Sequence, residues 1–347
     1  MSGLTKEKPV GVLRTGWSAE VADYAIAGDW ACNGSLLVVG DAAGGVYGFE
    51  GKSGAKKWAH PEVHDGGLLA LDMHRDGVRI ATVGQDGCVR IWSADDGQVL
   101  HTVELGNGWV ENVAWSPDGQ YLAVSLSRCV HVLDSQGREV WRSEEHPSTV
   151  STLAWAGSKD LATACYGRVS FFSASSGDLT QKLEWKGSLV SLVLSSDGNI
   201  VACGSQDNSV HFWRRSTGHD SAMQGYRGKP TALAFDDTGT LLATGGGDAV
   251  TVWSFQGDGP EGTRPGVLEL HVQPITKLSF SRRGRRLASG ARDGAVIVWS
   301  LQGDGSGAVS GAAVVDDVIS GIAWRPDDRG LAALDASGGV TVWRVGN

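Results

Sequence analysis

The chain of 347 residues carries 39 acidic and 30 basic side chains, a formal net charge of −9 at pH 7. Because a negative field repels phosphate backbones and anionic lipids, this charge predicts that neither nucleic acid nor a membrane surface is a partner. The composition, 41% hydrophobic with 50 glycines and 14 tryptophans, is typical of a folded, turn-rich protein and argues against a disordered or collagen-like chain.

The N-terminal segment MSGLTKEKPV (residues 1–10) has no apolar stretch of the kind that signals export, and no run in the chain resembles a spanning helix. We therefore expect a cytoplasmic protein in which residues 1–8 form a tail. The cysteines are odd in number and lack C-x-x-C spacing, which favours small buried thiols over a disulfide framework or a metal site. They are Cys32, Cys88, Cys129, Cys165 and Cys203.

The first strand-like run, VGVLRTGWS (residues 10–18), matches no strand of the repeat that follows. From residue 23 onwards the chain is periodic: a short apolar run ending in a large side chain recurs eight times, at intervals of 39 to 46 residues. A period this regular indicates a repeat architecture. The anchor residues of the eight runs are Phe49, Trp92, Leu133, Phe172, Trp213, Trp253, Trp299 and Trp343.

Each repeat predicts four short strands. Upstream of an anchor stand two apolar runs joined by a polar turn, as in WVENVAWSPDGQYLAVS (109–125), which indicates a β-hairpin. A further short run follows the anchor, as in QVLHTVE (98–104). Helical periodicity is absent almost everywhere, so the chain is expected to be all-β. Since a lone four-stranded sheet cannot bury both faces, the repeats must stack and close into a ring.

The length of the repeat, its SPDGQYLA hairpin (116–123) and its strand ending in Trp resemble the WD-repeat (WD40) family of β-propellers. The resemblance covers roughly residues 9–346, although the Trp-Asp pair itself appears only as Trp-Ser or Trp-Arg. It implies a stand-alone, eight-bladed β-propeller of four-stranded antiparallel blades, one domain over residues 9–347. The alternative is seven blades, which is commoner in the family.

The last run, GVTVWR (339–344), is read as the third strand of the eighth blade. Residues 10–18 are expected to supply the fourth strand by pairing antiparallel outside Val340–Arg344. Such pairing would leave no open edge at this blade.

The resemblance also implies a structural network in which a His, a Ser or Thr, an Asp and the anchor Trp satisfy one another within a blade. Two repeats hold the complete set: His64, Thr82, Asp86 and Trp92 in one, and His271, Ser289, Asp293 and Trp299 in the other. A hydrolase triad is the competing interpretation of such residues. The structural interpretation is favoured because a buried polar group without a partner costs about 1–3 kcal/mol.

In propellers that resemble this chain, partners are held by residues at the start of the first strand and just before the turn Asp. Transferred position by position, these are Tyr24, Ile26, Leu69, Trp109, Glu111, Thr149, Lys229 and Thr276, with Gln85, Gln206 and Arg292 before the Asp positions. Trp109 is the strongest candidate, because exposed aromatic residues are typical interface anchors. The competing role for Trp109 is packing between blades.

Three further motifs were weighed. The GKS at residues 51–53 lacks the spacing of a phosphate loop, and His60, His64 and His74 form no convincing metal cluster, because His64 already belongs to the structural network. The segment SRRGRR (281–286) concentrates four arginines on one turn of an acidic protein. It is either a solvated turn or a docking patch for an acidic or phosphorylated segment.

These observations favour a non-catalytic scaffold, monomeric by itself, that docks a protein or peptide on the loop face of the propeller, with no cofactor and no catalytic residue. One alternative is a small-molecule or cofactor-binding propeller, although the repeat supplies neither metal ligands nor stacking groups for a cofactor. Another is an accessory protein to a CobW-type metal-chaperone GTPase, which rests on overall likeness to stand-alone bacterial WD-repeat proteins.

Overall fold

The computed structural model describes residues 9–257 and 259–346, so the expected tail at residues 1–8 lies outside the described residues. All regular elements in this part of the chain are β-strands. The chain divides into two compact units, a central unit (Glu20–Leu189) and a terminal unit (Met1–Ala19 with Val190–Asn347).

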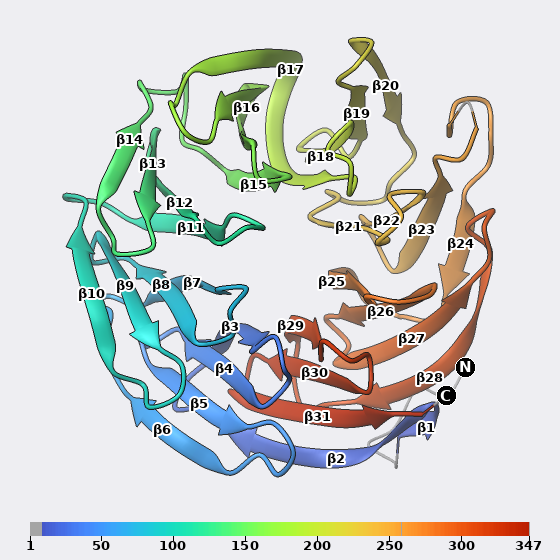
Figure 1. The fold of residues 1–347 in the computed structure, drawn as a ribbon. Coiled ribbons are helices and arrows are strands. Elements are labelled where there is room, and N and C mark those ends of the chain that lie inside the picture. The colour runs from blue at the N-terminus through green and yellow to red at the C-terminus, as the bar shows by residue number, and fades with distance from the viewer. Residues whose placement is uncertain (1–8, 258, 347) are drawn as a thin grey trace. The chain divides into compact units, whose positions relative to one another are not determined.

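The central unit contains three complete four-stranded antiparallel sheets (Figure 1). The strands of the first sheet are β3 (Ala25–Trp30), β4 (Leu36–Asp41), β5 (Val46–Glu50) and β6 (Lys56–His60). Those of the second are β7 (Leu68–Met73), β8 (Arg79–Gly84), β9 (Cys88–Ser93) and β10 (Val99–Glu104). Those of the third are β11 (Val110–Trp115), β12 (Tyr121–Leu126), β13 (Cys129–Asp134) and β14 (Glu139–Arg142). Then follow β15 (Thr152–Ala156), β16 (Asp160–Ser173) and β17 (Leu179–Leu194), which crosses the boundary between the units.

The terminal unit begins with β18 (Ile200–Ser205), β19 (Val210–Arg214) and β20 (His219–Met223). A four-stranded sheet of β21 (Ala232–Phe235), β22 (Leu241–Gly245), β23 (Ala249–Ser254) and β24 (Gly266–Glu269) follows. The remaining strands are β25 (Ile275–Phe280), β26 (Arg286–Ala291), β27 (Ala295–Leu301), β28 (Gly307–Val314), β29 (Ile319–Trp324), β30 (Gly330–Asp335), β31 (Gly339–Val345), β1 (Val10–Gly11) and β2 (Leu13–Glu20).

The hairpin turns form because their polar residues bond to the turn backbone. In the turn between β11 and β12, the Ser116 carbonyl accepts the Gly119 N–H at 2.8 Å, and the Asp118 carboxylate accepts the Gln120 N–H at 3.1 Å. Gly119 has a φ of 75°, a left-handed conformation that glycine adopts at little cost. The SPDG sequence therefore fixes where this hairpin turns.

The core lies between neighbouring sheets and explains the continuous apolar runs of the middle strands. In the central unit, Val83, Ile91, Trp115 and Val124 are among the buried side chains of one cluster that joins the β7–β10 and β11–β14 sheets. Every residue of β4 is buried, whereas β10 alternates between exposed and half-buried positions because it lies at the edge of its sheet. Strands covered on both faces are expected to be uniformly apolar.

The expectation of eight separate four-stranded blades is wrong, because the hydrogen-bonded strands of residues 9–257 and 259–346 form seven sheets. Five of these sheets have four strands, one has five, and one, in the order β15-β16-β17-β18-β19-β20, has six. All eight anchors do lie on strands, but Phe172 on β16 and Trp213 on β19 share the six-stranded sheet. Seven, the alternative considered above, is the number of sheets found.

Two long strands account for this difference. β16 has 14 residues and β17 has 16, each about twice the usual length of a strand. Residues 105–109 separate β10 from β11, but no irregular connection interrupts β17 at the equivalent point of its repeat. The strand therefore continues through the position where a new blade is expected. The repeat length alone could not reveal this, because the 16 residues of β17 nearly equal the 17 residues from Val99 to Trp115 that form β10, the connection and β11.

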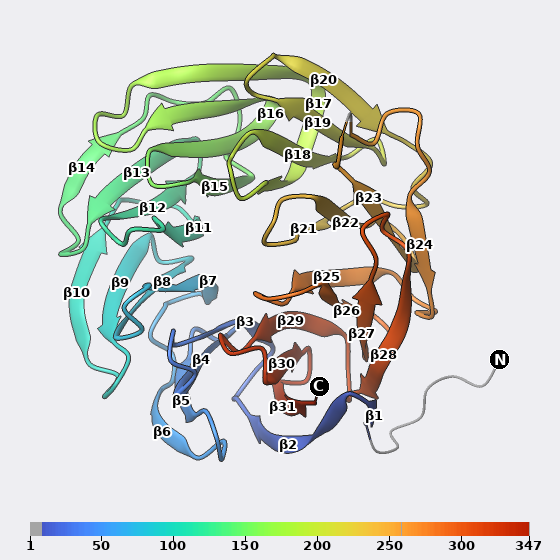
Figure 2. The ribbon, with the colours of Figure 1, turned by 45° about the vertical axis from the view of Figure 1, so that its right-hand side comes forward.

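In the terminal unit, β2 lies alongside β31 at the outer side of the sheet β2-β31-β30-β29 (Figures 1 and 2). The short β1 pairs instead with β28, with Val10 opposite Ala312 and Gly11 opposite Gly311. Leu13, at the start of β2, is fully buried in a cluster that includes Val296 and Trp343. The N-terminal run thus contributes to two sheets of this unit.

Candidate functional site

The polar network of the second sheet is a continuous chain of hydrogen bonds. The indole N–H of Trp92 donates to the Thr82 hydroxyl at 2.9 Å, and Thr82 Oγ1 lies 2.8 Å from His64 Nε2. His64 Nδ1 lies 2.9 Å from an Asp86 carboxylate oxygen. The Thr82 hydroxyl accepts from Trp92 and is therefore free to donate to Nε2, which leaves Nδ1–H to donate to Asp86.

Burial and charge fix the protonation of this network. Burial is the largest influence on His64 and lowers its pKa below the usual value, despite the opposing effect of Asp86. Burial would raise the pKa of Asp86, but hydrogen bonds from His64 and Arg90 outweigh it and lower that pKa. His64 is therefore neutral near pH 7 and Asp86 is ionised.

A second network of the same type lies in the terminal unit. His271 Nε2 is 2.8 Å from the Ser289 hydroxyl, which also accepts the Trp299 indole N–H at 2.8 Å. His271 Nδ1 lies 3.3 Å from Asp293, whose other carboxylate oxygen accepts the Val272 N–H at 2.9 Å. All four residues of each predicted set are thus brought together.

A third arrangement was missed because it uses tyrosine in place of histidine. The Tyr226 hydroxyl lies 2.8 Å from the Thr244 hydroxyl and accepts the Trp253 indole N–H at 3.0 Å. Trp253 follows Thr244 by nine positions, whereas Trp92 follows Thr82 by ten. This one-residue deletion in the turn was the available sequence signal that the repeat differs here.

These networks have the chemistry of a structural support and not of a reaction centre. The His64 and His271 side chains have no exposed surface, and Thr82 and Ser289 are fully buried, so no substrate can reach them. The described residues also contain no group of three His, Cys, Asp or Glu side chains placed to hold a metal ion. His74, for example, uses Nε2 to contact the Gly119 carbonyl at 2.9 Å.

Several predicted partner-binding residues share one backbone feature. The pairing of the first two strands of a sheet shifts by one residue at Ile26, Leu69, Glu111 and Thr276, so each of these is the extra residue of a β-bulge. A bulge redirects the side chain away from the regular alternation of a strand. The sequence alignment with the family therefore selected a recurring structural position.

In the central unit, Trp109 is exposed, with 53% of its surface accessible. It follows Gly108 at the end of the connection between β10 and β11. This connection lies against the turn that contains Gln85: the Leu105 N–H donates to the Gly87 carbonyl at 3.0 Å, and a Cβ on Gly87 would be 3.3 Å from the Gly108 carbonyl oxygen. Gln85 and Trp109 thus come from two segments that are in contact.

The other predicted residues of the central unit differ in exposure. Thr149 is exposed, whereas Tyr24, Ile26, Leu69, Gln85 and Glu111 are half-buried. Partial burial raises the pKa of the Glu111 carboxyl. A carboxyl beside exposed Trp109 combines an apolar surface with a polar group, a mixture that is common at protein interfaces.

In the terminal unit, Gln206, Lys229 and Arg292 are exposed and Thr276 is half-buried. The Thr276 hydroxyl is already engaged, because it contacts the Ile319 carbonyl at 2.6 Å and the Gly290 carbonyl at 3.2 Å. Thr276 thus joins the starts of two neighbouring sheets. Lys229 and Arg292 are the charged members of this set, and neither forms an ion pair with another described residue.

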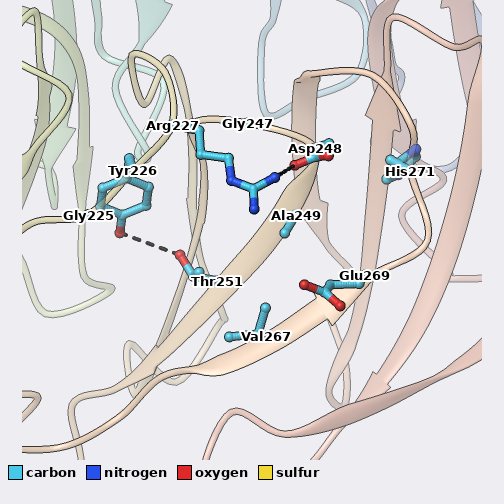
Figure 3. A pocket seen from close by; sticks show the side chains of 11 residues that line it. Gly225, Tyr226, Arg227, Gly247, Asp248, Ala249, Thr251, Val267, Glu269 and His271 are labelled. Atoms are coloured by element: carbon cyan, nitrogen blue, oxygen red, sulfur yellow. Dashed lines mark hydrogen bonds and ion pairs between the residues drawn. The ribbon is translucent and has the colours of Figure 1, made fainter.

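A pocket of about 430 Å³ opens beside Tyr226 in the terminal unit (Figure 3). Its floor is the face of β23 and β24 that carries Thr251 opposite Val267, and its rim carries Arg227, paired with Asp248 at 3.5 Å. The position of Thr251 is occupied by a larger residue in five of the other repeats, namely Tyr47, Arg90, His131, His211 and Ile297. The short side chain of Thr251 forms part of the wall of this pocket.

Stacked antiparallel sheets held by recurring buried networks define a repeat protein of the β-propeller class. The family model of the WD domain, G-beta repeat, matches just over half of the chain, at residues 58–93, 97–134, 177–214, 217–254 and 262–300. The chain therefore belongs to the WD-repeat family.

The curated relatives are divergent. The chain is 24% identical over 270 residues to the guanine nucleotide-binding protein subunit beta of Arabidopsis thaliana, covering 65% of this chain and 66% of that one. It is 28% identical over 211 residues to cell division cycle 20.1, cofactor of APC complex, from the same organism, covering 54% and 44%. It is 26% identical over 193 residues to the WD repeat-containing protein slp1 of Schizosaccharomyces pombe, covering 52% and 40%. The chain thus matches between 40% and 66% of the length of these three relatives.

The fold resembles the crystal structure of the computationally designed Ika8 protein, with a TM-score of 0.79 and 22% identity over 94% of this chain and 98% of that one. This likeness supports the fold alone. Across the described residues, no helix has the length and apolar character needed to cross a membrane.

Proposed function

We propose that this protein is a non-catalytic scaffold that docks a protein or peptide partner at the loop surface around Trp109. Interaction scaffolds are typical of WD-repeat propellers, and the name of one relative, a cofactor of the APC complex, describes a protein that works within an assembly. The candidate docking surface consists of Gln85, Trp109 and Glu111 in the central unit.

The observation that carries this proposal is the exposure of Trp109. Among the described residues it is the one tryptophan with an exposed side chain, and its indole N–H has no partner there. A large apolar side chain with a free donor is a typical interface anchor, since both its surface and its N–H gain on contact. The remaining predicted residues of the central unit, Tyr24, Ile26, Leu69 and Thr149, are proposed as further contacts. In the terminal unit, Gln206, Lys229, Thr276 and Arg292 are proposed as contacts in the same way.

The test begins with affinity purification of the wild-type protein and of Trp109→Ala from cells that express it. A partner recovered with wild type is then produced separately, and its Kd is measured by calorimetry. Loss of a central aromatic anchor costs about 2 kcal/mol or more, so we expect Trp109→Ala to weaken binding about thirtyfold.

The matched control is Leu100→Ala. Leu100 is also an exposed apolar residue of the central unit, with 46% of its surface accessible, but it lies near the start of β10, at the end of that strand where Val99 pairs with Trp92. We expect this variant to bind as wild type does. A folded Trp109→Ala protein that keeps every partner at wild-type affinity would show that the docking surface lies elsewhere.

A further inference from the structure

An arginine-lined cleft lies at the opposite end of the strands from Thr276 and Arg292. Its volume is about 460 Å³, and its walls are the β25–β26 turn, the end of β27, the β29–β30 turn and the end of β31, all in the terminal unit. Arg283, Arg285, Arg286 and Arg329 line it. This concentration of positive charge contrasts with the net charge of −9 of the whole chain.

The acidic groups of the cleft are already occupied. Asp327 accepts two hydrogen bonds from Arg325, at 2.8 and 2.6 Å, and the Asp328 carboxylate accepts the backbone N–H groups of Arg282 and Arg283 at 2.9 and 2.8 Å. The hydrogen bond from Arg325 lowers the pKa of Asp327, so this carboxylate remains ionised and paired. Asp327 and Asp328 keep their charges, but four arginines line the cleft against these two carboxylates, so the cleft carries an excess of positive charge.

The guanidinium groups that face the cleft are largely free. Arg286 donates one N–H to the Gly346 carbonyl at 3.0 Å, which holds it in place. Arg283, Arg285 and Arg329 form no ion pair with any described residue, and all three are exposed. Arginines in such a position repel one another unless an anion lies between them.

We propose that this cleft binds a phosphate group carried by a phosphorylated serine or threonine of a protein partner. Guanidinium groups present paired N–H donors that match the oxygens of a phosphate, and charge-assisted bonds of this kind are stronger than neutral ones. The choice of a protein as carrier rests on the proposed scaffold function. The cleft belongs to the terminal unit and shares no residue with the Trp109 surface, so it concerns a separate contact.

The charge of the protein favours a single phosphate over a polyanion. A nucleic acid or an anionic bilayer would extend over much more of the surface, and the chain as a whole has nine more acidic than basic groups to repel it. A phosphorylated side chain places its charge within the cleft and exposes only a short peptide beyond it. The local field of the arginines then acts with little opposition, because the Debye length is about 8 Å at physiological ionic strength.

The test is a calorimetric titration with a five-residue peptide that carries one phosphothreonine and no other charged side chain. The same peptide without the phosphate and inorganic phosphate are titrated alongside it. We expect the phosphorylated peptide to bind at least tenfold more tightly than the other two. The variant Arg285→Gln/Arg329→Gln should weaken its binding at least tenfold. The variant Arg285→Lys/Arg329→Lys should give an intermediate Kd, because lysine keeps the charge but not the paired donors.

Two controls keep the result interpretable. Arg264→Gln removes an exposed arginine outside the cleft and should bind the phosphorylated peptide as wild type does. Trp109→Ala should also bind it normally, so failure of the Trp109 surface and failure of the cleft are seen separately. Circular dichroism and urea unfolding of each variant confirm that the cleft is folded.

Any of four results would overturn the proposal. The first is equal affinity for the phosphorylated and the unphosphorylated peptide, and the second is wild-type affinity of the Arg285→Gln/Arg329→Gln variant for the phosphorylated peptide. The third is an affinity for inorganic phosphate equal to that for the phosphorylated peptide, which would indicate a site for a free anion. The fourth is tighter binding of a twelve-nucleotide single-stranded DNA than of the phosphorylated peptide, which would indicate a nucleic-acid site.

Discussion

The carboxylate of Asp72 on β7 accepts the backbone N–H of Trp115 on β11, at 2.6 Å, and so joins two neighbouring sheets of the central unit. One repeat earlier, the carboxylate of Asp29 accepts the Met73 N–H at 3.2 Å in the same way. Asp29 and Asp72 occupy equivalent positions in their sheets, and the charge of Asp29 acts on the Asp72 carboxyl group. Two acidic groups thus hold the first strands of three successive sheets in register.

This pair predicts an unusual dependence of stability on pH. Burial, reinforced by the nearby charge of Asp29, raises the pKa of Asp72 to about 8. The folded protein then keeps a proton that the unfolded chain loses near pH 4, so the stabilisation it provides is complete below pH 4 and is lost as the pH rises towards about 8. The variant Asp72→Asn cannot ionise and should gain in melting temperature relative to wild type as the pH is raised from 5 to 9.

Asp65→Asn is the control for that measurement, because Asp65 is an exposed residue of the same unit. Its melting temperature should follow that of wild type across the whole range. A constant difference between wild type and Asp72→Asn from pH 5 to 9 would show that Asp72 does not take up a proton on folding.

The sequence was informative where a physical requirement recurs with the period of the repeat. Trp92, Thr82 and His64 could be grouped because the resemblance to WD repeats implies such a network, and the structure shows that the three groups bond to one another. Leu69 and Glu111 were transferred from the same family pattern, and each proves to be the extra residue of a bulge at the same point of its repeat.

Features that arise only from the conformation or the tertiary arrangement of the chain were not predictable in this way. β17 joins two expected blades because no connection interrupts it, and the period hides this since the anchors Phe172 and Trp213 remain 41 residues apart. The pocket beside Tyr226 brings together residues as far apart in the chain as Gly225 and His271. The arginine cleft needed tertiary structure, because Arg285 and Arg329 are 44 positions apart in the chain.

Thr82→Val should destabilise the central unit strongly. Valine has a similar shape but no hydroxyl, so the Trp92 indole N–H and His64 Nε2 would both lose their partner in a fully buried position. Each buried group left unpaired costs about 1–3 kcal/mol. Chemical denaturation measures the loss, and Thr102→Val, at an exposed position of β10, is the control that should change little. Equal unfolding midpoints for the two variants would contradict a structural role for the network.

Tyr226→Phe tests whether tyrosine replaces histidine in the third network. The change removes only the hydroxyl that accepts from Trp253 and bonds to Thr244. We expect a loss of about 1–2 kcal/mol in the free energy of unfolding, smaller than for Thr82→Val because Trp253 is only half-buried. Tyr166→Phe removes an exposed hydroxyl and should be neutral. If the two tyrosine variants unfold at the same urea concentration, the Tyr226 hydroxyl makes no net contribution.

Leu13→Ala tests whether the N-terminal run is an integral part of the terminal unit. Leu13 has no exposed surface and packs in a cluster with Ala288, Val296 and Trp343, which come from three other strands. Removing a buried leucine side chain costs about 2–5 kcal/mol, because the lost contacts leave a cavity that neighbours fill only in part. Val10→Ala is the matched control, since Val10 is 56% exposed on the adjacent β1 and its truncation should change stability by at most about 0.5 kcal/mol. Urea unfolding of both variants decides the matter: a Leu13→Ala midpoint equal to that of Val10→Ala would mean that β2 can leave β31 without cost to the rest of the unit.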